Sequence, residues 1–187
     1  MNSRRHVVAV IGNARLNPGS EKYKLAQSVG EKLVDERYRL LTGGLGGVME
    51  AACRGARSSA GWYEGCSIGL LPGSDPAKAN PYVDIVIPTG LDHGRNSIVA
   101  QADAVVAIGG GAGTLSEIAF AWIHKRLIIG LNCDGWSGRL ADQRVDERDR
   151  YPDLPDDRVY GAQDATEVLT LLRTYLPAYI GRHSLIA

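Results

Sequence analysis

Six short apolar runs recur along the chain, and segments with helical hydrophobic periodicity lie between them. Apolar runs of this length, in alternation with helices, are typical of parallel strands buried on both faces of a sheet. The runs cover residues 6–11, 38–42, 67–71, 83–87, 104–108 and 127–131. The alternation predicts an α/β fold in which right-handed crossovers build an open, doubly wound parallel sheet of Rossmann-like type.

Four helices are predicted from capping residues and apolar spacing. Ser20 can cap the first helix, because a serine side chain accepts a hydrogen bond from the first turn, and a second helix follows Gly47. A last helix is predicted over 164–176, with Asp164 and Glu167 as a capping-box pair and Pro177 as its stop. The first and third helices each carry an apolar stripe, formed by Leu25, Ala26, Val29 and Leu33 and by Leu115, Ile118, Ala119 and Trp122.

The length and composition favour one globular domain. The chain has 187 residues, of which 44% are hydrophobic and 22% are charged, so a single nucleotide-binding domain over residues 1–187 is expected. The only shift in composition is the charged stretch 139–158, which is interpreted as a solvated excursion near the end of the sheet.

Charge and cysteine content exclude several classes of partner. Lys+Arg and Asp+Glu number 21 each, so no overall field favours a nucleic acid polymer, and an anion must be held by local geometry. The apolar run at the start is too short for a signal peptide or a membrane span. Cys53, Cys66 and Cys133 lack disulfide or zinc spacing, which favours a protein of the reducing cytoplasm without a metal site. No cofactor is expected.

Two glycine clusters, TGGLGGVME from Thr42 and IGGGAGTLSE from Ile108, each follow an apolar run and open a helix. Glycines let backbone amides approach a ligand closely, and a helix start adds unpaired N–H groups, so such a loop suits a phosphate. In doubly wound sheets, ligands bind beyond the carboxyl ends of the strands. The predicted phosphate-binding residues are Gly43, Gly44, Gly46, Gly47, Gly109, Gly110, Gly111, Gly113 and Thr114.

Neither cluster has the Walker pattern or the dinucleotide pattern, which weakens the case for a triphosphate or for NAD. A tight strand-to-helix turn without a ligand is the alternative interpretation of each loop. Thr114 and Glu117 also have the T-x-x-E spacing of a capping box, which would explain both residues without any chemistry.

The segment 90–106 supplies a candidate cation next to the second loop. A guanidinium such as that of Arg95 makes forked contacts with phosphate or carboxylate. The alternative is a surface arginine that caps a helix or pairs with Asp92. His93 is the weaker candidate, because a lone loop histidine is more often an exposed or locally bonded residue than a catalyst.

Three motifs in this order, GGLGGVMEAACRGA from Gly43, GRNSIV around Arg95 and GGGAGTLSEIAFAW from Gly109, carry a family resemblance over residues 6–131. The chain resembles the superfamily that contains the Lonely Guy phosphoribohydrolases, the proteins once labelled possible lysine decarboxylases, and the molybdenum-cofactor carrier proteins. Nothing in the sequence marks a Schiff-base lysine or a pyridoxal site, so the decarboxylase label has no support.

The resemblance implies roles for particular residues. Arg95 and Glu117 match the arginine and glutamate that, in the hydrolase branch, promote N-glycosidic cleavage of nucleoside monophosphates. Asn96 and Gly109 stand where that branch has lysine and proline, and Gly12-Asn13-Ala14 stands where its first strand ends in G-S-S. In these motifs the chain is similar to the cofactor-carrier branch. Gly12, Asn13 and Asn96 are accordingly expected to join the ligand-binding residues.

Two functions follow as alternatives, and both bind a phosphorylated nucleotide-like molecule. The first is a phosphoribohydrolase that releases free base and ribose 5-phosphate from a nucleoside 5′-monophosphate. The second is a carrier that holds molybdenum cofactor, or another phosphorylated pterin or nucleotide, without turnover. A homodimer or larger homo-oligomer is also expected, since relatives assemble and Ala51, Ala52 and Ala56 give the second helix a small-residue surface.

Overall fold

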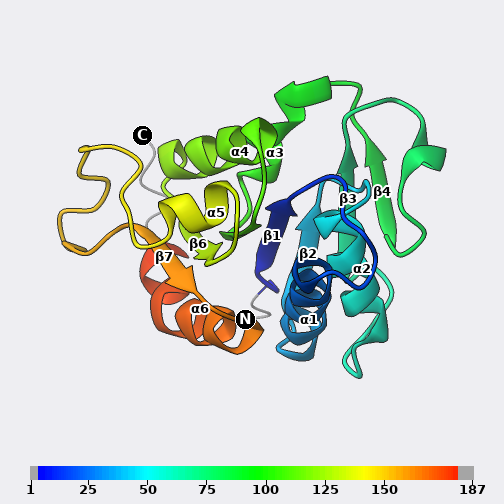
Figure 1. The fold of residues 1–187 in the computed structure, drawn as a ribbon, viewed down its shortest axis with the longest axis horizontal. Coiled ribbons are helices and arrows are strands. Elements are labelled where there is room, and N and C mark those ends of the chain that lie inside the picture. The colour runs from blue at the N-terminus through cyan, green and yellow to red at the C-terminus, as the bar shows by residue number, and fades with distance from the viewer. Residues whose placement is uncertain (1–3, 181–187) are drawn as a thin grey trace.

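A computed structural model describes residues 4–180 and contains one seven-stranded sheet in the order β4-β3-β2-β1-β5-β6-β7 (Figure 1). Every neighbouring pair of strands runs parallel. The strands are β1 (Val7–Gly12), β2 (Arg39–Thr42), β3 (Ser67–Leu71), β4 (Ile85–Pro88), β5 (Ala104–Ile108), β6 (Leu127–Leu131) and β7 (Val159–Ala162). The predicted α/β, doubly wound parallel fold is confirmed.

Helices cover both faces of the sheet, as alternate strand residues require. Val8 and Val10 of β1 belong to one apolar cluster and Ala9 and Ile11 to the other, because successive side chains of a strand point to opposite faces. The first cluster packs under α1 (Glu21–Asp35), α2 (Val48–Ser58) and α6 (Ala165–Ile180), and the second under α3 (Asn96–Val99), α4 (Ala112–Ile123) and α5 (Trp136–Leu140). Two 3₁₀ turns, η1 (Pro76–Lys78) and η2 (Asp92–Arg95), precede β4 and α3.

Five details differ from the sequence-based predictions, and the first is the number of strands. All six predicted strands are present, with ends shifted by two residues at most, but β7 was missed. It is only four residues long and follows directly on the charged stretch, so it lacks a distinct apolar run. Its pairing with β6 places it at the edge of the sheet (Figure 1).

The last helix was predicted to stop at Pro177 but continues through that residue to Ile180. Leu176 and Tyr179 on either side of the proline are buried against the sheet, and this packing outweighs the lost backbone hydrogen bond. The predicted start is confirmed, because the Asp164 carboxylate accepts hydrogen bonds from the Thr166 and Glu167 amides at 2.7 and 3.0 Å.

The buried face of α4 is rotated from the predicted stripe. Ile118 and Trp122 are buried as expected, whereas Leu115 and Ala119 are only half-buried. The other buried positions of this helix are Thr114, Glu117 and Ala121. The rotation brings two polar residues to the inner side of the helix, where they can contribute to a site.

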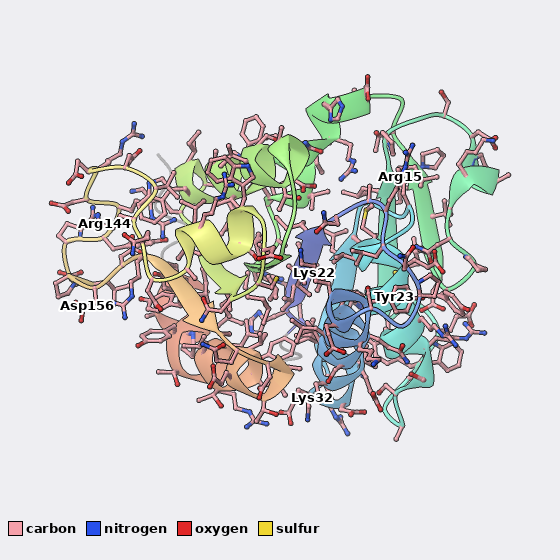
Figure 2. All side chains as sticks on the ribbon, in the orientation of Figure 1. Arg15, Lys22, Tyr23, Lys32, Arg144 and Asp156 are labelled. Atoms are coloured by element: carbon pink, nitrogen blue, oxygen red, sulfur yellow. The ribbon has the colours of Figure 1, made fainter. Side chains whose placement is uncertain are left out.

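The charged stretch is not solvated throughout. Arg144 and Asp156 lie on its outer loop at the edge of the molecule (Figure 2). Arg150 and Asp157, in contrast, are 3% and 2% exposed and form a bidentate ion pair, with N···O distances of 2.8 and 2.5 Å. The Arg150 guanidinium also stacks 3.6 Å from the centroid of the Trp122 ring. The solvated interpretation is therefore wrong for these two residues, which anchor the loop.

The small residues of α2 face the interior instead of a partner subunit. Ala51, Ala52 and Ala56 are buried, and a Cβ at Gly30 of α1 would collide with the Ala52 carbonyl. Close packing of α1 on α2 thus accounts for these alanines, and the surface proposed for self-association does not exist there. Within residues 4–180, no helix is long and apolar enough to span a membrane.

Candidate functional site

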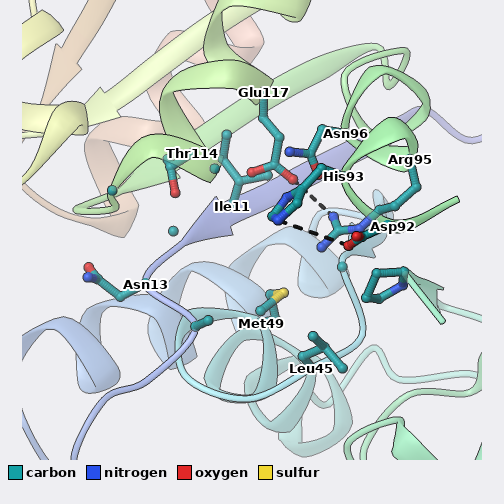
Figure 3. A pocket seen from close by; sticks show the side chains of 16 residues that line it. Ile11, Asn13, Leu45, Met49, Asp92, His93, Arg95, Asn96, Thr114 and Glu117 are labelled. Atoms are coloured by element: carbon teal, nitrogen blue, oxygen red, sulfur yellow. Dashed lines mark hydrogen bonds and ion pairs between the residues drawn. The ribbon is translucent and has the colours of Figure 1, made fainter.

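A cleft of about 470 Å³ opens where the chain reverses its direction across the sheet. The first four strands extend from β1 to one edge, and β5 then returns to pair with β1 on its other side. Ligand sites of doubly wound sheets lie at this switch point, beyond the carboxyl ends of the strands. The predicted site residues that line the cleft are Gly12, Asn13, Gly43, Arg95, Asn96, Gly111, Gly113, Thr114 and Glu117 (Figure 3).

Arg95 and Glu117 form an ion pair in the wall of this cleft. The Arg95 Nη1 to Glu117 Oε1 distance is 3.0 Å, and the two side chains are 10% and 9% exposed. Burial raises the pKa of Glu117 to about 7, although the positive charge of Arg95 opposes that rise. The pair joins η2 to α4, two elements that meet only in the folded chain (Figure 3).

The geometry excludes both a Thr114–Glu117 capping box and a surface Arg95 paired with Asp92. The helix α4 begins at Ala112 with Gly111 as its N-cap, so Thr114 is not a capping residue. Glu117 bonds to Arg95 instead of reaching back toward Thr114, and no capping box forms. Arg95 in turn is a buried residue paired with Glu117, not a surface arginine paired with Asp92.

Gly43 makes room for the Arg95 guanidinium. A Cβ at this position would lie 2.5 Å from Nη2 and 2.7 Å from Nη1 of Arg95, and 2.7 Å from Sδ of Met49. Any side chain would displace at least one of these groups. The Nε atom of Arg95 is buried and has no hydrogen-bond partner among the described residues, so it remains a free donor beside the cleft.

The first turn of α4 presents unpaired amides to the cleft. The N–H groups of Ala112, Gly113 and Thr114 have no intrahelical partner, since they precede the first i→i−4 bond, and the Gly111 N-cap has no side chain to cover them. Gly111, Gly113 and Thr114 line the cleft, and the Thr114 hydroxyl points into it in Figure 3. Amides in this arrangement, at the positive end of a helix dipole, suit an anion.

Neighbouring elements hold the loop before α4 in place. The Gly110 amide donates to Oδ1 of Asn13 at 2.9 Å, and the Gly109 amide donates to Oγ of Ser137 at 2.7 Å. Both glycines have positive φ, +66° and +92°, which other residues rarely adopt. Gly109 and Gly110 therefore shape the loop and are not among the residues that line the cleft. Ser137 lies in α5, far along the chain, and no sequence motif pointed to it.

The first glycine loop contributes less to the cleft than predicted. Only Gly43 of its four glycines lines the cavity, whereas Gly44 and Gly47 have positive φ and Gly46 packs near the Ala14 carbonyl. The Val48 amide at the start of α2 already donates to the Asn13 carbonyl at 2.9 Å. The two loops are thus unequal, and α4 offers the more available anion site.

Several lining residues were not predicted. Leu45, Met49 and Pro72 give the cleft an apolar side. Asp92 and His93, from η2, lie at its exposed mouth, where His93 Nε2 and Asp92 Oδ1 are 4.0 Å apart. The sequence analysis named His93 as the weaker candidate and Asp92 only as a possible partner of Arg95, and neither was assigned to the site.

Comparisons with known proteins bear on this geometry. Residues 5–157 match the SLOG cluster4 family. Cytokinin riboside 5′-monophosphate phosphoribohydrolase LOG7 of Arabidopsis thaliana is 30% identical over 168 residues, which cover 82% of this chain and 75% of that protein.

Two solved structures are similar over most of the fold. The molybdenum cofactor binding protein of the phototrophic bacterium Rippkaea orientalis has a TM-score of 0.73 and 32% identity, and the match covers 91% of this chain and 97% of that one. The molybdenum cofactor carrier protein of Chlamydomonas reinhardtii has a TM-score of 0.73 and 27% identity, with 93% and 99% covered.

Proposed function

The chain belongs to the SLOG cluster4 family, and from this premise we propose that it is a phosphoribohydrolase that binds a nucleoside 5′-monophosphate in the cleft between β1 and β5. The resemblance to the Lonely Guy and molybdenum-cofactor carrier superfamily that the three motifs indicated is confirmed by the same comparisons. One observation carries the proposal. An uncapped helix N-terminus and a buried Arg95–Glu117 pair line the same cleft.

The phosphate is assigned to the first turn of α4. The amides of Ala112, Gly113 and Thr114 would each donate to a phosphate oxygen, and the Thr114 hydroxyl would add a fourth donor. The hydrogen bonds from Gly110 to Asn13 and from Gly109 to Ser137 support this role, because they fix the preceding loop before a ligand arrives. A preorganised loop loses less conformational entropy on binding.

Glu117 is assigned the chemical step. As the bond between ribose C1′ and the base nitrogen breaks, its electron pair leaves with the base, and the Glu117 carboxylate stabilises the positive charge that develops on the ribose. A water oxygen then bonds to C1′ and its proton passes to Glu117, while the departing base takes a proton from solvent. The products are the free base and ribose 5-phosphate. A carboxyl group whose pKa is about 7 can accept and release this proton near neutral pH.

The second candidate is a carrier that holds molybdenum cofactor, or another phosphorylated pterin, without turnover. It is favoured by the likeness to two proteins whose names state molybdenum cofactor binding or carriage. Asn96 also departs from the lysine of the hydrolase pattern, and here its amide donates to Ser116 Oγ at 2.8 Å. A carrier would use the same phosphate site.

The deciding experiment is incubation of the protein with a panel of nucleoside 5′-monophosphates, followed by chromatography for free base and ribose 5-phosphate. A hydrolase releases both products in equal amounts, and Arg95→Ala abolishes both binding and release. Saturable binding without release would favour the carrier. No binding of any nucleotide, and none of a phosphorylated pterin, would reject the phosphate site.

The remaining expectations from the sequence belong to this proposal. Residues 1–187 would act as one nucleotide-binding domain in the cytoplasm, where the free thiols of Cys53, Cys66 and Cys133 stay reduced. The protein would form a homodimer or larger homo-oligomer, although not through the alanines of α2. Sedimentation at micromolar concentration tests the assembly, and a monomer would reject it.

A further inference from the structure

Beyond the predicted phosphate site, Leu45, Met49, Pro72 and His93 line a part of the cleft that we call the slot, and these side chains suit a flat ring. Leu45 and Met49 reach into the cavity from one side and His93 from the other (Figure 3). Pro72 also lines the cavity. Apolar side chains, a thioether and an imidazole all pack favourably on the face of a heteroaromatic ring. A ligand whose phosphate lies at α4 would therefore place its ring system here.

Asp92 stands at the open end of this slot with a carboxylate that is available to a ligand. Its side chain is 86% exposed, and within residues 4–180 its one ion-pair contact is the 4.0 Å approach to His93 Nε2, which is too long for a hydrogen bond. The Asp92 backbone is held in place, because its amide donates to the Pro72 carbonyl at 2.9 Å and its φ is +49°. The backbone that carries the Asp92 carboxylate is therefore held in place beside the slot.

We propose that Asp92 determines which ring the cleft accepts, and that it selects a 2-amino-oxo ring of the guanine or pterin type. This inference rests on the proposed phosphate site. A carboxylate accepts two parallel hydrogen bonds from the ring N–H and the adjacent 2-amino group of such a ring. Adenine offers one amino donor beside a ring nitrogen that is itself an acceptor, so it would leave one Asp92 oxygen facing a lone pair. Guanine and pterin share the recognised edge.

The test is a set of dissociation constants measured by isothermal titration calorimetry with the Glu117→Gln variant, which prevents turnover, and repeated with wild type. The ligands are GMP, IMP, AMP, 6-hydroxymethylpterin phosphate and ribose 5-phosphate. GMP is expected to bind at least tenfold more tightly than AMP, and IMP, which lacks the 2-amino group, is expected to lose most of that advantage. The relative affinities of GMP and the pterin phosphate show whether the cleft prefers a guanine or a pterin ring.

The decisive variant is Asp92→Asn in the same background, because the amide keeps the size of the side chain and removes one acceptor and the charge. It should abolish the preference for GMP over AMP and leave the affinity for ribose 5-phosphate unchanged. Asp156→Asn, on the outer loop, is the matched control for loss of one negative charge. Equal affinity for GMP and AMP, or a preference that survives in Asp92→Asn, would overturn the inference. Failure of ribose 5-phosphate to bind would instead reject the phosphate site, and the inference with it.

Discussion

Replacement of Gly43 by alanine should separate Arg95 from Glu117 without disturbing the rest of the fold. The added methyl group would lie 2.5 Å from Arg95 Nη2 and 2.7 Å from Met49 Sδ, far inside ordinary contact distance. Both atoms are at the ends of flexible side chains, so these side chains move and the backbone does not. Restoring an ordinary contact requires the guanidinium to shift by roughly 1 Å, with van der Waals contact at about 3.5–4.0 Å.

The magnitude follows from the geometry of the ion pair. With an effective dielectric constant of about 20, two unit charges attract by about 5.5 kcal/mol at the observed 3.0 Å and by about 4.1 kcal/mol at about 4 Å. The difference of about 1.4 kcal/mol corresponds to about one pH unit in the titration of Glu117, and its direction is upward because Arg95 favours the ionised form. At pH 7 the ionised fraction would then fall from about one half to about one tenth.

The assay is a ¹³C NMR titration of the glutamate carboxyl groups, with the Glu117 signal assigned from its loss in Glu117→Gln. The wild-type signal should titrate with a pKa of about 7 and the Gly43→Ala signal about one pH unit higher. Gly73→Ala is the control, since a Cβ there meets nothing within 4 Å and Gly73 is not among the residues that line the cleft. A Glu117 titration that is the same in Gly43→Ala and wild type would refute the coupling between Gly43, Arg95 and Glu117.

Four further predictions can be checked with purified protein. Gly111→Val should weaken the binding of nucleoside monophosphates in calorimetry, because a Cβ there projects into open cleft space, and unchanged affinity would place the ligand elsewhere. Asn13→Asp keeps the acceptor for the Gly110 amide but adds a negative charge, so affinity for inorganic phosphate should fall at least tenfold while the melting temperature changes little. The free energy of unfolding should decrease by up to roughly 3 kcal/mol between pH 4.5 and about 7, since folded Glu117 holds a proton that the unfolded chain releases. Urea denaturation across this pH range measures the decrease, and the same pH dependence in Glu117→Gln as in wild type would contradict its assignment to Glu117. Arg150→Met leaves the Asp157 carboxylate buried without its partner and should cost about 3–5 kcal/mol in urea denaturation, whereas a loss below about 1 kcal/mol would mean that the loop opens freely.

The sheet was largely predictable because each central strand is a continuous apolar run between glycines or polar residues. β3, β5 and β6 have the predicted bounds. What failed was decided by tertiary packing. The buried position of Tyr179 carries α6 past Pro177, and the placement of α4 on the sheet selects Thr114 and Glu117 for its inner face instead of Leu115. Such choices depend on neighbours that periodicity alone does not identify.

The sequence predicted which residues lie at the candidate site better than it predicted what each of them does there. The three motifs brought Arg95 and Glu117 together, although 22 positions separate them in the chain. The same motifs assigned Gly43 to a ligand, and it lines the cleft, but they did not indicate that it also admits the Arg95 guanidinium. A glycine that contacts a phosphate and one that contacts a side chain have the same sequence signature, because both are required for close approach to the backbone.

The last prediction concerns the choice between hydrolase and carrier, which depends on Glu117. A buried carboxylate with a pKa near 7 lowers stability at neutral pH, since the cost of removing its charge from water exceeds the attraction to Arg95. Groups with strongly shifted pKa values are concentrated at catalytic sites, and this favours the hydrolase.

In a hydrolase, Glu117→Gln should retain nucleotide affinity within about threefold and lower kcat by at least about 100-fold, because the amide keeps the size but loses the charge that stabilises the ribosyl cation. In a carrier, the same variant should change neither ligand affinity nor the fate of the ligand, and calorimetry combined with chromatography for free base distinguishes the two results.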